Sequence, residues 1–248
     1  MRKISVLGFP VHLITKPEAL AHTQQLILSK PGHSCQVVTL NPEMIMAGMA
    51  NSPFGDVLKT ADLILPDGAG LVWSVRRAGY VVTRLPGIEF SESLLAWAAA
   101  EGIRVALVGA SPDVLDGAVN NLRRRYAGLN LVYQHHGFFK AEQEADIAAE
   151  CAATSPQIVL VALGVPRQEL WIKQYRDAFP NAVLIGVGGS LDVWSGLKKR
   201  APAWMRALNL EWAYRIGTEP WRLKRTYNTL PLFVVKIISN RHAVQAEQ

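Results

Sequence analysis

The stretch IRVALVGASPDVLDGAVNNLRRRY, residues 103–126, decides the fold class of this 248-residue chain. It begins with an apolar run that ends at the small residue Gly109, which is typical of a buried strand. Ser111 and Pro112 follow as the N-cap and first turn expected of a helix, and apolar residues then recur at helical spacing. The stretch therefore predicts a strand that leads directly into a helix.

The same alternation extends in both directions along the chain. Further strands are expected over 35–41, 61–67, 129–137, 157–164 and 182–189, with one or two more within 4–14. Helices are expected over 17–29, 141–155 and 166–179, with one or two within 42–61. Near-continuous Val, Ile and Leu runs in the strands indicate a parallel sheet with helices on both faces. We therefore predict an α/β fold with a Rossmann-like, mostly parallel sheet.

The composition is that of a folded protein without disulfides. Half of the residues are hydrophobic and 19% are charged, which argues against disorder. Cys35 and Cys151 lie far apart and in no metal-ligand spacing, which fits a reducing cytoplasm. The N-terminal apolar run contains Pro10 and His12, so we expect a strand there and no signal peptide. The sequence has no uninterrupted run of about 18 apolar residues, so we expect no transmembrane helix.

Positive charge is concentrated at the C-terminal end. The segment from Lys198 onward holds ten Lys and Arg against three acidic residues, whereas the whole chain has a net charge of +6. It also contains Trp204, Trp212 and Trp221, and the sheet pattern stops near Gly196. We therefore divide the chain into an α/β core, 1–197, and a basic, all-helical appendage, 198–248, broken at its prolines.

The appendage has several interpretations. It could bind nucleic acid, but no helix-turn-helix, RRM or KH module surrounds it, so we expect no nucleic-acid partner. Trp beside Arg and Lys suits an anionic membrane surface. Its arginines could instead fold over the site and bind a pyrophosphate, which the bidentate guanidinium favours. The remaining alternative is a solvated basic face.

Polar residues gather where several predicted strands end. They are Thr39 and Asn41, Asp67, Gly109 and Ser111, and Arg167 and Gln168. Because the carboxyl ends of parallel strands share one edge, where ligands bind in open α/β sheets, these residues are expected around one site. Each alone could be an ordinary turn or cap residue. Asp67 in particular, between Pro66 and Gly68, could be catalytic or could simply cap the next helix.

Several common sites are not predicted. GxGxxG and GxxxxGK[ST] are both missing, so neither a dinucleotide fingerprint nor a P-loop is indicated, although helix amides after Gly109 could still bind a phosphate. No DxD or other paired acids suggest a cation site, and the adjacent His135 and His136 cannot form a metal pair on one face of a strand. We therefore expect no metal and no cofactor.

Eight blocks in chain order resemble the WecG/TagA/CpsF family of bacterial glycosyltransferases. They are VVTLNPEM, TADLILPDGAGLVW, RLPGIEF, VALVGASPDV, QHHGFF, VALGVPRQELW, IGVGGSLDVWSG and KRAPAWMRALNLEWAYRIGTEPWRLKR. The resemblance implies a metal-independent, inverting transfer from a UDP-sugar to a polyprenyl-diphosphate-linked acceptor. The enzyme would lie peripherally on the inner, cytoplasmic face of the membrane, in teichoic acid, enterobacterial common antigen or exopolysaccharide synthesis. N-acetylmannosamine or its uronate is the favoured donor sugar and N-acetylglucosamine the acceptor, with glucose or galactose as the alternative donors.

Within this resemblance the residues take roles. Asp67 is the predicted general base. Substrate contacts are predicted for Thr39, Asn41, Gln168, Arg167 and Glu89, the last standing where the family usually has aspartate. UDP contacts are predicted for Arg215, Arg222, Arg225, Gly109 and Ser111, and the uracil is expected at the 109–111 or the 186–189 turn.

Other outcomes stay open at this point. An apolar patch could be covered by the appendage or by a second copy of the chain, which would make a homo-oligomer. The alternatives of another class are a nucleotide-cofactor enzyme and a nucleic-acid-binding protein. Neither alternative accounts for the strand-end residues and the basic appendage together.

Overall fold

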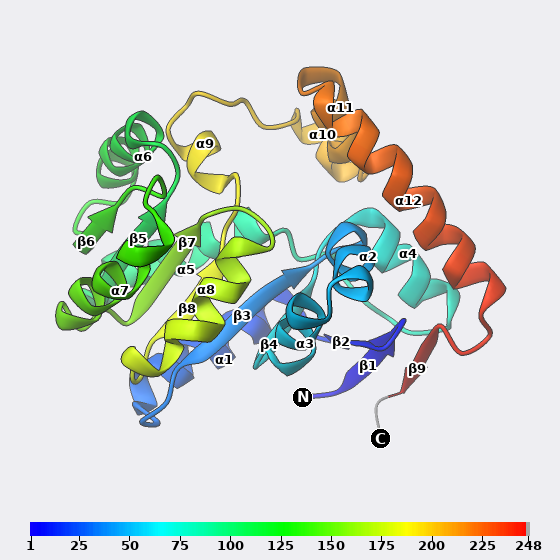
Figure 1. Cartoon of the computed structure of the whole chain (residues 1–248), viewed down its shortest axis with the longest axis horizontal. Helices are drawn as coiled ribbons and strands as arrows, with labels where there is room; N and C mark the ends of the chain where they lie inside the picture. Colours follow the sequence, from blue (N-terminus) through cyan, green and yellow to red (C-terminus); the bar gives the residue numbers. More distant parts are fainter. Residues whose placement is uncertain (247–248) are drawn as a thin grey trace.

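The computed structural model describes residues 1–246, except for the side chains of residues 221, 222 and 224–226. Its centre is a sheet of six strands in the order β4-β3-β8-β7-β5-β6 (Figure 1). The strands are β3 (Cys35–Leu40), β4 (Leu63–Pro66), β5 (Arg104–Gly109), β6 (Asn130–His135), β7 (Ile158–Ala162) and β8 (Val183–Gly186). All neighbouring pairs are parallel, which confirms the predicted sheet.

Helices cover both faces of this sheet. They are α1 (Lys16–Ser29), α2 (Pro42–Ala50), α3 (Ser52–Thr60), α4 (Ala69–Arg77), α5 (Gly87–Glu101), α6 (Pro112–Arg125), α7 (Glu144–Ala153), α8 (Arg167–Tyr175) and α9 (Ser190–Trp194). Successive side chains of a strand point to opposite faces. Leu107 of β5 accordingly packs in the core with α1, α5 and α6, whereas Val108 packs on the other face with α7 and α8.

The stretch that decided the fold class has the predicted structure. β5 ends at Gly109, and α6 begins at Pro112 with Ser111 at its N-cap, although the Ser111 side chain makes no capping hydrogen bond. Gly109 has a φ of 133°, and a Cβ atom there would collide with the backbone of Ala162 in β7. Glycine is therefore required for the close approach of these two strands.

A second, antiparallel sheet corrects two expectations. β1 (Lys3–Val6) and β2 (Phe9–His12) pair with each other, and β1 also pairs with β9 (Val244–Ala246). The N-terminal strands thus lie outside the parallel sheet, and the segment after Lys198 is not entirely helical. Three residues are too few for a recognisable alternating pattern, and β9 is held by a partner at the opposite end of the chain.

The rest of the C-terminal segment is helical. It consists of α10 (Ala203–Ala207), α11 (Glu211–Thr218) and α12 (Trp221–Ser239). Pro220 precedes α12 as expected, but Pro231 lies inside that helix and does not end it. Phe233 and Ile237 are buried in the cluster that α2, α3 and α4 share, and this packing sustains the helix beyond the proline.

The predicted division into a core, 1–197, and an appendage, 198–248, stays a prediction. Within the segment after residue 197, α12 contributes to the core, whereas α10 and α11 lie over the sheet edge (Figure 1). Within residues 1–246, none of the helices is at once long enough and apolar enough to span a bilayer.

Candidate active site

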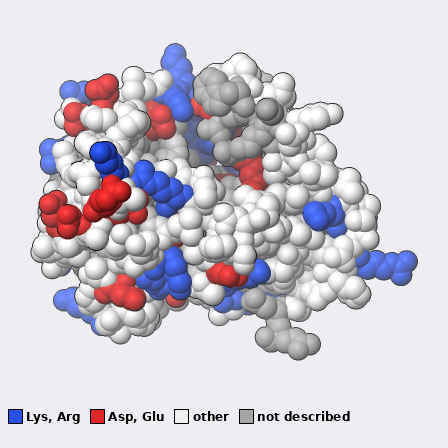
Figure 2. All heavy atoms as spheres, viewed as in Figure 1, with Lys and Arg blue, Asp and Glu red and all other residues white. Residues whose placement is uncertain are grey.

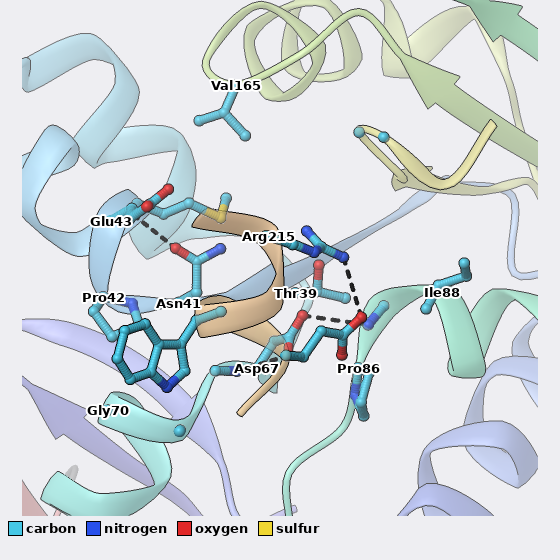
Figure 3. A pocket seen from close by; sticks show the side chains of 18 of the residues that line it. Thr39, Asn41, Pro42, Glu43, Asp67, Gly70, Pro86, Ile88, Val165 and Arg215 are labelled. Atoms are coloured by element: carbon cyan, nitrogen blue, oxygen red, sulfur yellow. Dashed lines mark hydrogen bonds and ion pairs between the residues drawn. The ribbon is translucent and has the colours of Figure 1, made fainter. Parts of the chain in front are cut away.

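A cavity of about 530 Å³ lies at the carboxyl edge of β3, β4, β7 and β8, and α11 and α12 contribute to its wall (Figure 3). The polar and charged residues that line it are Thr39, Asn41, Glu43, Asp67, Arg84, Gln168, Glu169, Ser190, Asn209, Glu211 and Arg215. The structure thus brings together five residues that the sequence singled out: Thr39, Asn41, Asp67, Gln168 and Arg215. The edge predicted from the parallel sheet is where the cavity lies.

Asp67 follows the last residue of β4 and is held by backbone amides. Its Oδ1 accepts a hydrogen bond from the N–H of Gly68 at 2.6 Å, and its Oδ2 accepts one from the N–H of Gly87 at 3.4 Å. The N-cap of α4 is Gly68, with a φ of 83°, and no side chain caps that helix. The interpretation of Asp67 as a helix cap is therefore wrong, and its carboxylate faces the cavity (Figure 3).

The surroundings of Asp67 make it more basic than an ordinary aspartate. The side chain keeps 28% of its surface, but that surface faces the cavity, and burial among protein atoms raises its pKa. Arg84, whose Nε lies 3.9 Å from Oδ1, opposes this rise most strongly, followed by the two backbone amides and Arg215. A carboxylate with a raised pKa accepts a proton more readily, which suits a general base.

Thr39 and Asn41 present unused polar atoms to the same cavity. Asn41 is the N-cap of α2, and its Oδ1 accepts from the N–H of Met44 at 3.1 Å. Among the described residues, nothing hydrogen-bonds the Asn41 amide nitrogen or the Thr39 hydroxyl. Thr39 packs against Gly87, where a Cβ atom would come within 2.9 Å of the hydroxyl oxygen. These groups are therefore available to a ligand.

Gln168 is engaged with the protein. Its Oε1 accepts from the N–H of Gly188 at 3.0 Å, and its Nε2 donates to Oε1 of Glu169 at 2.7 Å. Both side chains are almost fully buried, and a Cβ atom on Gly186 would collide with them. Gln168 thus holds the 186–189 turn in place at the cavity wall, and its predicted contact with a sugar stays a prediction.

Glu169 is a lining residue that the sequence analysis missed. Only 2% of it is exposed, and burial raises its pKa to about 7, partly offset by the hydrogen bond from Gln168. Its second oxygen, Oε2, has no partner among the described residues. A glutamate at the start of a helix is ordinarily exposed, so no local pattern distinguishes it from a surface residue.

A second missed residue, Glu211, connects α11 to the core. It accepts hydrogen bonds from Arg84 at 3.0 Å, from Arg200 at 3.1 Å and from Arg215 at 3.4 Å. Burial alone would raise the pKa of Glu211, but these guanidinium groups, Arg200 foremost, lower it overall. The buried carboxylate therefore stays charged and fixes three cations beside the cavity.

Arg84 bridges the two sides of the cavity. Besides Glu211 and Asp67, it contacts Asn209, to whose Oδ1 its Nη1 donates at 3.1 Å. Its side chain is only 13% exposed. The residue stands in the RLPG stretch before α5, and it was not among the arginines predicted from the sequence to contact substrate or UDP.

Other predicted residues lie elsewhere. Glu89 pairs with Arg200 at 2.7 Å and with Arg206 at 3.4 Å, outside the cavity lining. Arg167 pairs with Glu144 at 2.9 Å and donates to backbone carbonyls on the far side of its helix.

The two turns predicted to hold the uracil differ in whether they line the cavity. The 109–111 turn does not line the cavity, whereas the 186–189 turn does. The predicted ligands Arg222 and Arg225 are on α12, but their side chains lie outside the described residues.

The described residues contain no group of three His, Cys, Asp or Glu side chains close enough to hold a metal ion. The expectation of a metal-independent reaction stays a prediction. The cations that the structure places beside the cavity are guanidinium groups, with Arg215 half exposed at 49% and bound to Glu211.

Comparison with known proteins agrees with the resemblance drawn from the sequence. The glycosyl transferase WecG/TagA/CpsF family matches residues 4–246. An N-acetylglucosaminyldiphosphoundecaprenol N-acetyl-beta-D-mannosaminyltransferase of Bacillus subtilis (strain 168) is 38% identical over 203 residues, which cover 82% of this chain and 78% of the relative. A protein of the same name from Staphylococcus aureus (strain NCTC 8325 / PS 47) is 30% identical over 244 residues, 98% of this chain and 95% of the relative.

Proposed function

The chain belongs to the WecG/TagA/CpsF family of glycosyl transferases, and we propose that it moves a hexosamine-type sugar from a UDP-sugar to N-acetylglucosamine on a polyprenyl diphosphate. N-acetylmannosamine or its uronate is the favoured sugar, because the relatives' names specify an N-acetylmannosaminyl group. The observation that carries the proposal is the cavity whose lining holds both Asp67, with its raised pKa, and the guanidinium of Arg215.

The proposed reaction is a single displacement with inversion. A hydroxyl oxygen of the acceptor sugar attacks the anomeric carbon, the bond from that carbon to the UDP oxygen breaks, and Asp67 takes the hydroxyl proton. The amides of Gly68 and Gly87 fix the orientation of the carboxylate. The hydroxyl of Thr39 and the amide nitrogen of Asn41, which have no partner among the described residues, would hydrogen-bond the reacting sugars.

Negative charge develops on the departing UDP and needs a cation. We assign this role to Arg215, since it lines the cavity and its hydrogen bond to Glu211, at 3.4 Å, is a long one. Arg222 and Arg225 would add to it from the next helix. We propose that these arginines replace a metal ion, in agreement with the family resemblance.

We also propose that α10–α12 rest on the inner face of the cytoplasmic membrane. Their exposed large apolar residues are Trp204, Leu208, Trp212, Leu223, Tyr227, Leu232, Val235 and Ile238. Such residues beside arginine and lysine favour the headgroup region of an anionic bilayer. On the face seen in Figure 2, the half over α2, α4 and α12 is mostly uncharged, with isolated basic residues. Co-sedimentation of the whole chain with anionic but not with neutral vesicles would support this, and equal recovery with both would contradict it.

UDP release tests the proposed reaction. Purified protein is given a panel of UDP-sugars and a polyprenyl-diphosphate-linked N-acetylglucosamine, and release is measured with and without the acceptor. We expect acceptor-dependent release with one donor, and a loss of about 10²–10⁴-fold in Asp67→Asn, the usual contribution of a general base.

Asp116→Asn is the matched control, because Asp116 is exposed on α6 and outside the cavity. Release that survives Asp67→Asn would move the base to another residue. Acceptor-dependent release from UDP-glucose or UDP-galactose would favour the exopolysaccharide alternative. A second copy of the chain as partner stays a prediction, which size measurements at working concentration would settle.

A further inference from the structure

A second cavity adjoins the first. It measures about 500 Å³ and is lined by Ala69, Val72, Trp73, Arg76, Arg77 and Asn209. Ala69 and Asn209 also line the first cavity, so the two share part of their wall. The second cavity therefore lies beside the first, along α4.

Among the described residues, no acidic side chain compensates the two positive charges of the second cavity. Arg76 donates to the carbonyl of Val82 through Nε and Nη2, and Arg77 lies over the ring of Trp73, 5.9 Å from its centroid. Neither arginine forms an ion pair with any side chain that the structure describes, and both are exposed. The arginines around the first cavity differ, since Arg84, Arg200 and Arg215 are all bound to Glu211. Two adjacent guanidinium groups without an acidic partner among the described residues suit an anion with several oxygens, such as a diphosphate.

The length of α4 brings Arg76 and Arg77 within reach of an acceptor whose sugar lies at Asp67. Asp67 immediately precedes α4, and Arg77 ends it, about 12 Å from Ala69 at the usual rise of 1.5 Å per residue. A hexose followed by a diphosphate has a comparable length. In a displacement with inversion the acceptor approaches from the face opposite the leaving group. The base Asp67 thus lies on the acceptor's side, and α4 runs on from it to Arg76 and Arg77.

We propose that Arg76 and Arg77 bind the diphosphate of the polyprenyl-linked acceptor while its sugar reaches Asp67. This inference rests on the proposed function and adds to it a binding site for the acceptor's charged group. Trp73, with 38% of its surface exposed, lies beside Arg77 where the lipid chain would leave the diphosphate. An exposed Trp next to a cation suits the boundary between headgroups and acyl chains.

The test measures acceptor and donor KM separately for the full-length protein. The acceptor is short-chain polyprenyl-diphosphate-linked N-acetylglucosamine in neutral detergent, so that no anionic bilayer contributes to binding. We expect Arg77→Gln to raise the acceptor KM about tenfold, the effect of losing one charge-assisted hydrogen bond, and to leave the donor KM unchanged. Arg77→Lys should restore part of the difference.

Arg124→Gln is the matched control, because Arg124 is also an exposed arginine in the last turn of a helix, α6, away from both cavities. A second acceptor with one phosphate in place of two gives an independent readout. Wild type should prefer the diphosphate, and Arg77→Gln should lose that preference.

Each other outcome overturns the inference. An unchanged acceptor KM in Arg77→Gln, with normal transfer by wild type, would refute the diphosphate site and leave the proposed function intact. A raised donor KM would assign the arginines to UDP. An effect seen only with anionic vesicles would mean that they bind lipid headgroups. No transfer by wild type to any acceptor would refute the proposed function and this site together.

Discussion

Replacing Glu169 by glutamine should change how the stability of the fold depends on pH. The Glu169 carboxyl is buried, and its pKa is raised from 4.5 to about 7. In the unfolded chain the group loses its proton near pH 4.5, whereas in the native state it keeps the proton until pH 7. Between these values the native state binds more protons than the unfolded state, so the free energy of unfolding falls as pH rises.

The size of the effect follows from the two pKa values. The difference between 4.5 and about 7 corresponds to about 3 kcal/mol, at about 1.4 kcal/mol per unit. Glutamine does not titrate, and its amide oxygen can still accept the hydrogen bond from Gln168. The stability of Glu169→Gln relative to wild type should therefore grow by about 3 kcal/mol from pH 4 to pH 8.

Urea unfolding, followed by far-UV circular dichroism at half-unit pH steps, measures this difference. Other titrating groups are shared by the two proteins and cancel in the comparison. Glu142→Gln is the control, because Glu142 is exposed and its curve should run parallel to that of wild type. If Glu169→Gln also ran parallel to wild type from pH 4 to pH 8, the carboxyl would not be buried as a neutral acid, and the reasoning would fail.

Three further predictions concern the site. Arg215→Gln should lower kcat, measured by steady-state kinetics, about 10- to 100-fold, because one or two charge-assisted hydrogen bonds to the leaving group are lost. Thermal melts should show little change in melting temperature. Glu211→Ala should lower the free energy of unfolding, measured in urea, by about 3 kcal/mol or more, because it leaves three guanidinium groups without their buried partner. Proteases should then cut the segment that follows Lys198 more readily than in wild type. Excess EDTA should leave the rate of UDP release unchanged, and a rate that falls and returns with Mg²⁺ or Mn²⁺ would contradict the role given to the arginines.

Much of the fold was predictable because its signals are local. The strand that ends at Gly109 and the helix that follows Ser111 are each determined by a few neighbouring residues. The parallel sheet then follows from alternation, and it places Thr39, Asn41 and Asp67 at one edge without any knowledge of contacts. The orientation of the Asp67 carboxylate was not predictable locally, since one of its two hydrogen bonds comes from the N–H of Gly87, which is twenty residues further along the chain.

It was harder to predict which of two adjacent residues in one motif faces the cavity. The sequence suggested Arg167 and Gln168 for the same task, yet Arg167 turns away to Glu144 while Gln168 reaches Gly188. Successive residues of a helix point in directions about 100° apart, so one of such a pair usually faces away from a given site. Which of the two faces the cavity depends on where α8 packs, and α8 is placed by long-range contacts.

The charge network around Arg84 shows why a base and an appendage distant in sequence must be considered together. Arg84 lies 3.9 Å from Asp67 and is the strongest of the groups that lower the pKa of that acid, but burial outweighs it. Arg84 also lies 3.0 Å from Glu211, where Arg200 and Arg215 act more strongly than Arg84 and together the three outweigh burial, so Asp67 is the more basic of the two acids. The basicity of a residue at the end of β4 thus depends on Arg84, before α5, and on Arg215 of α11, which only the folded chain brings within reach.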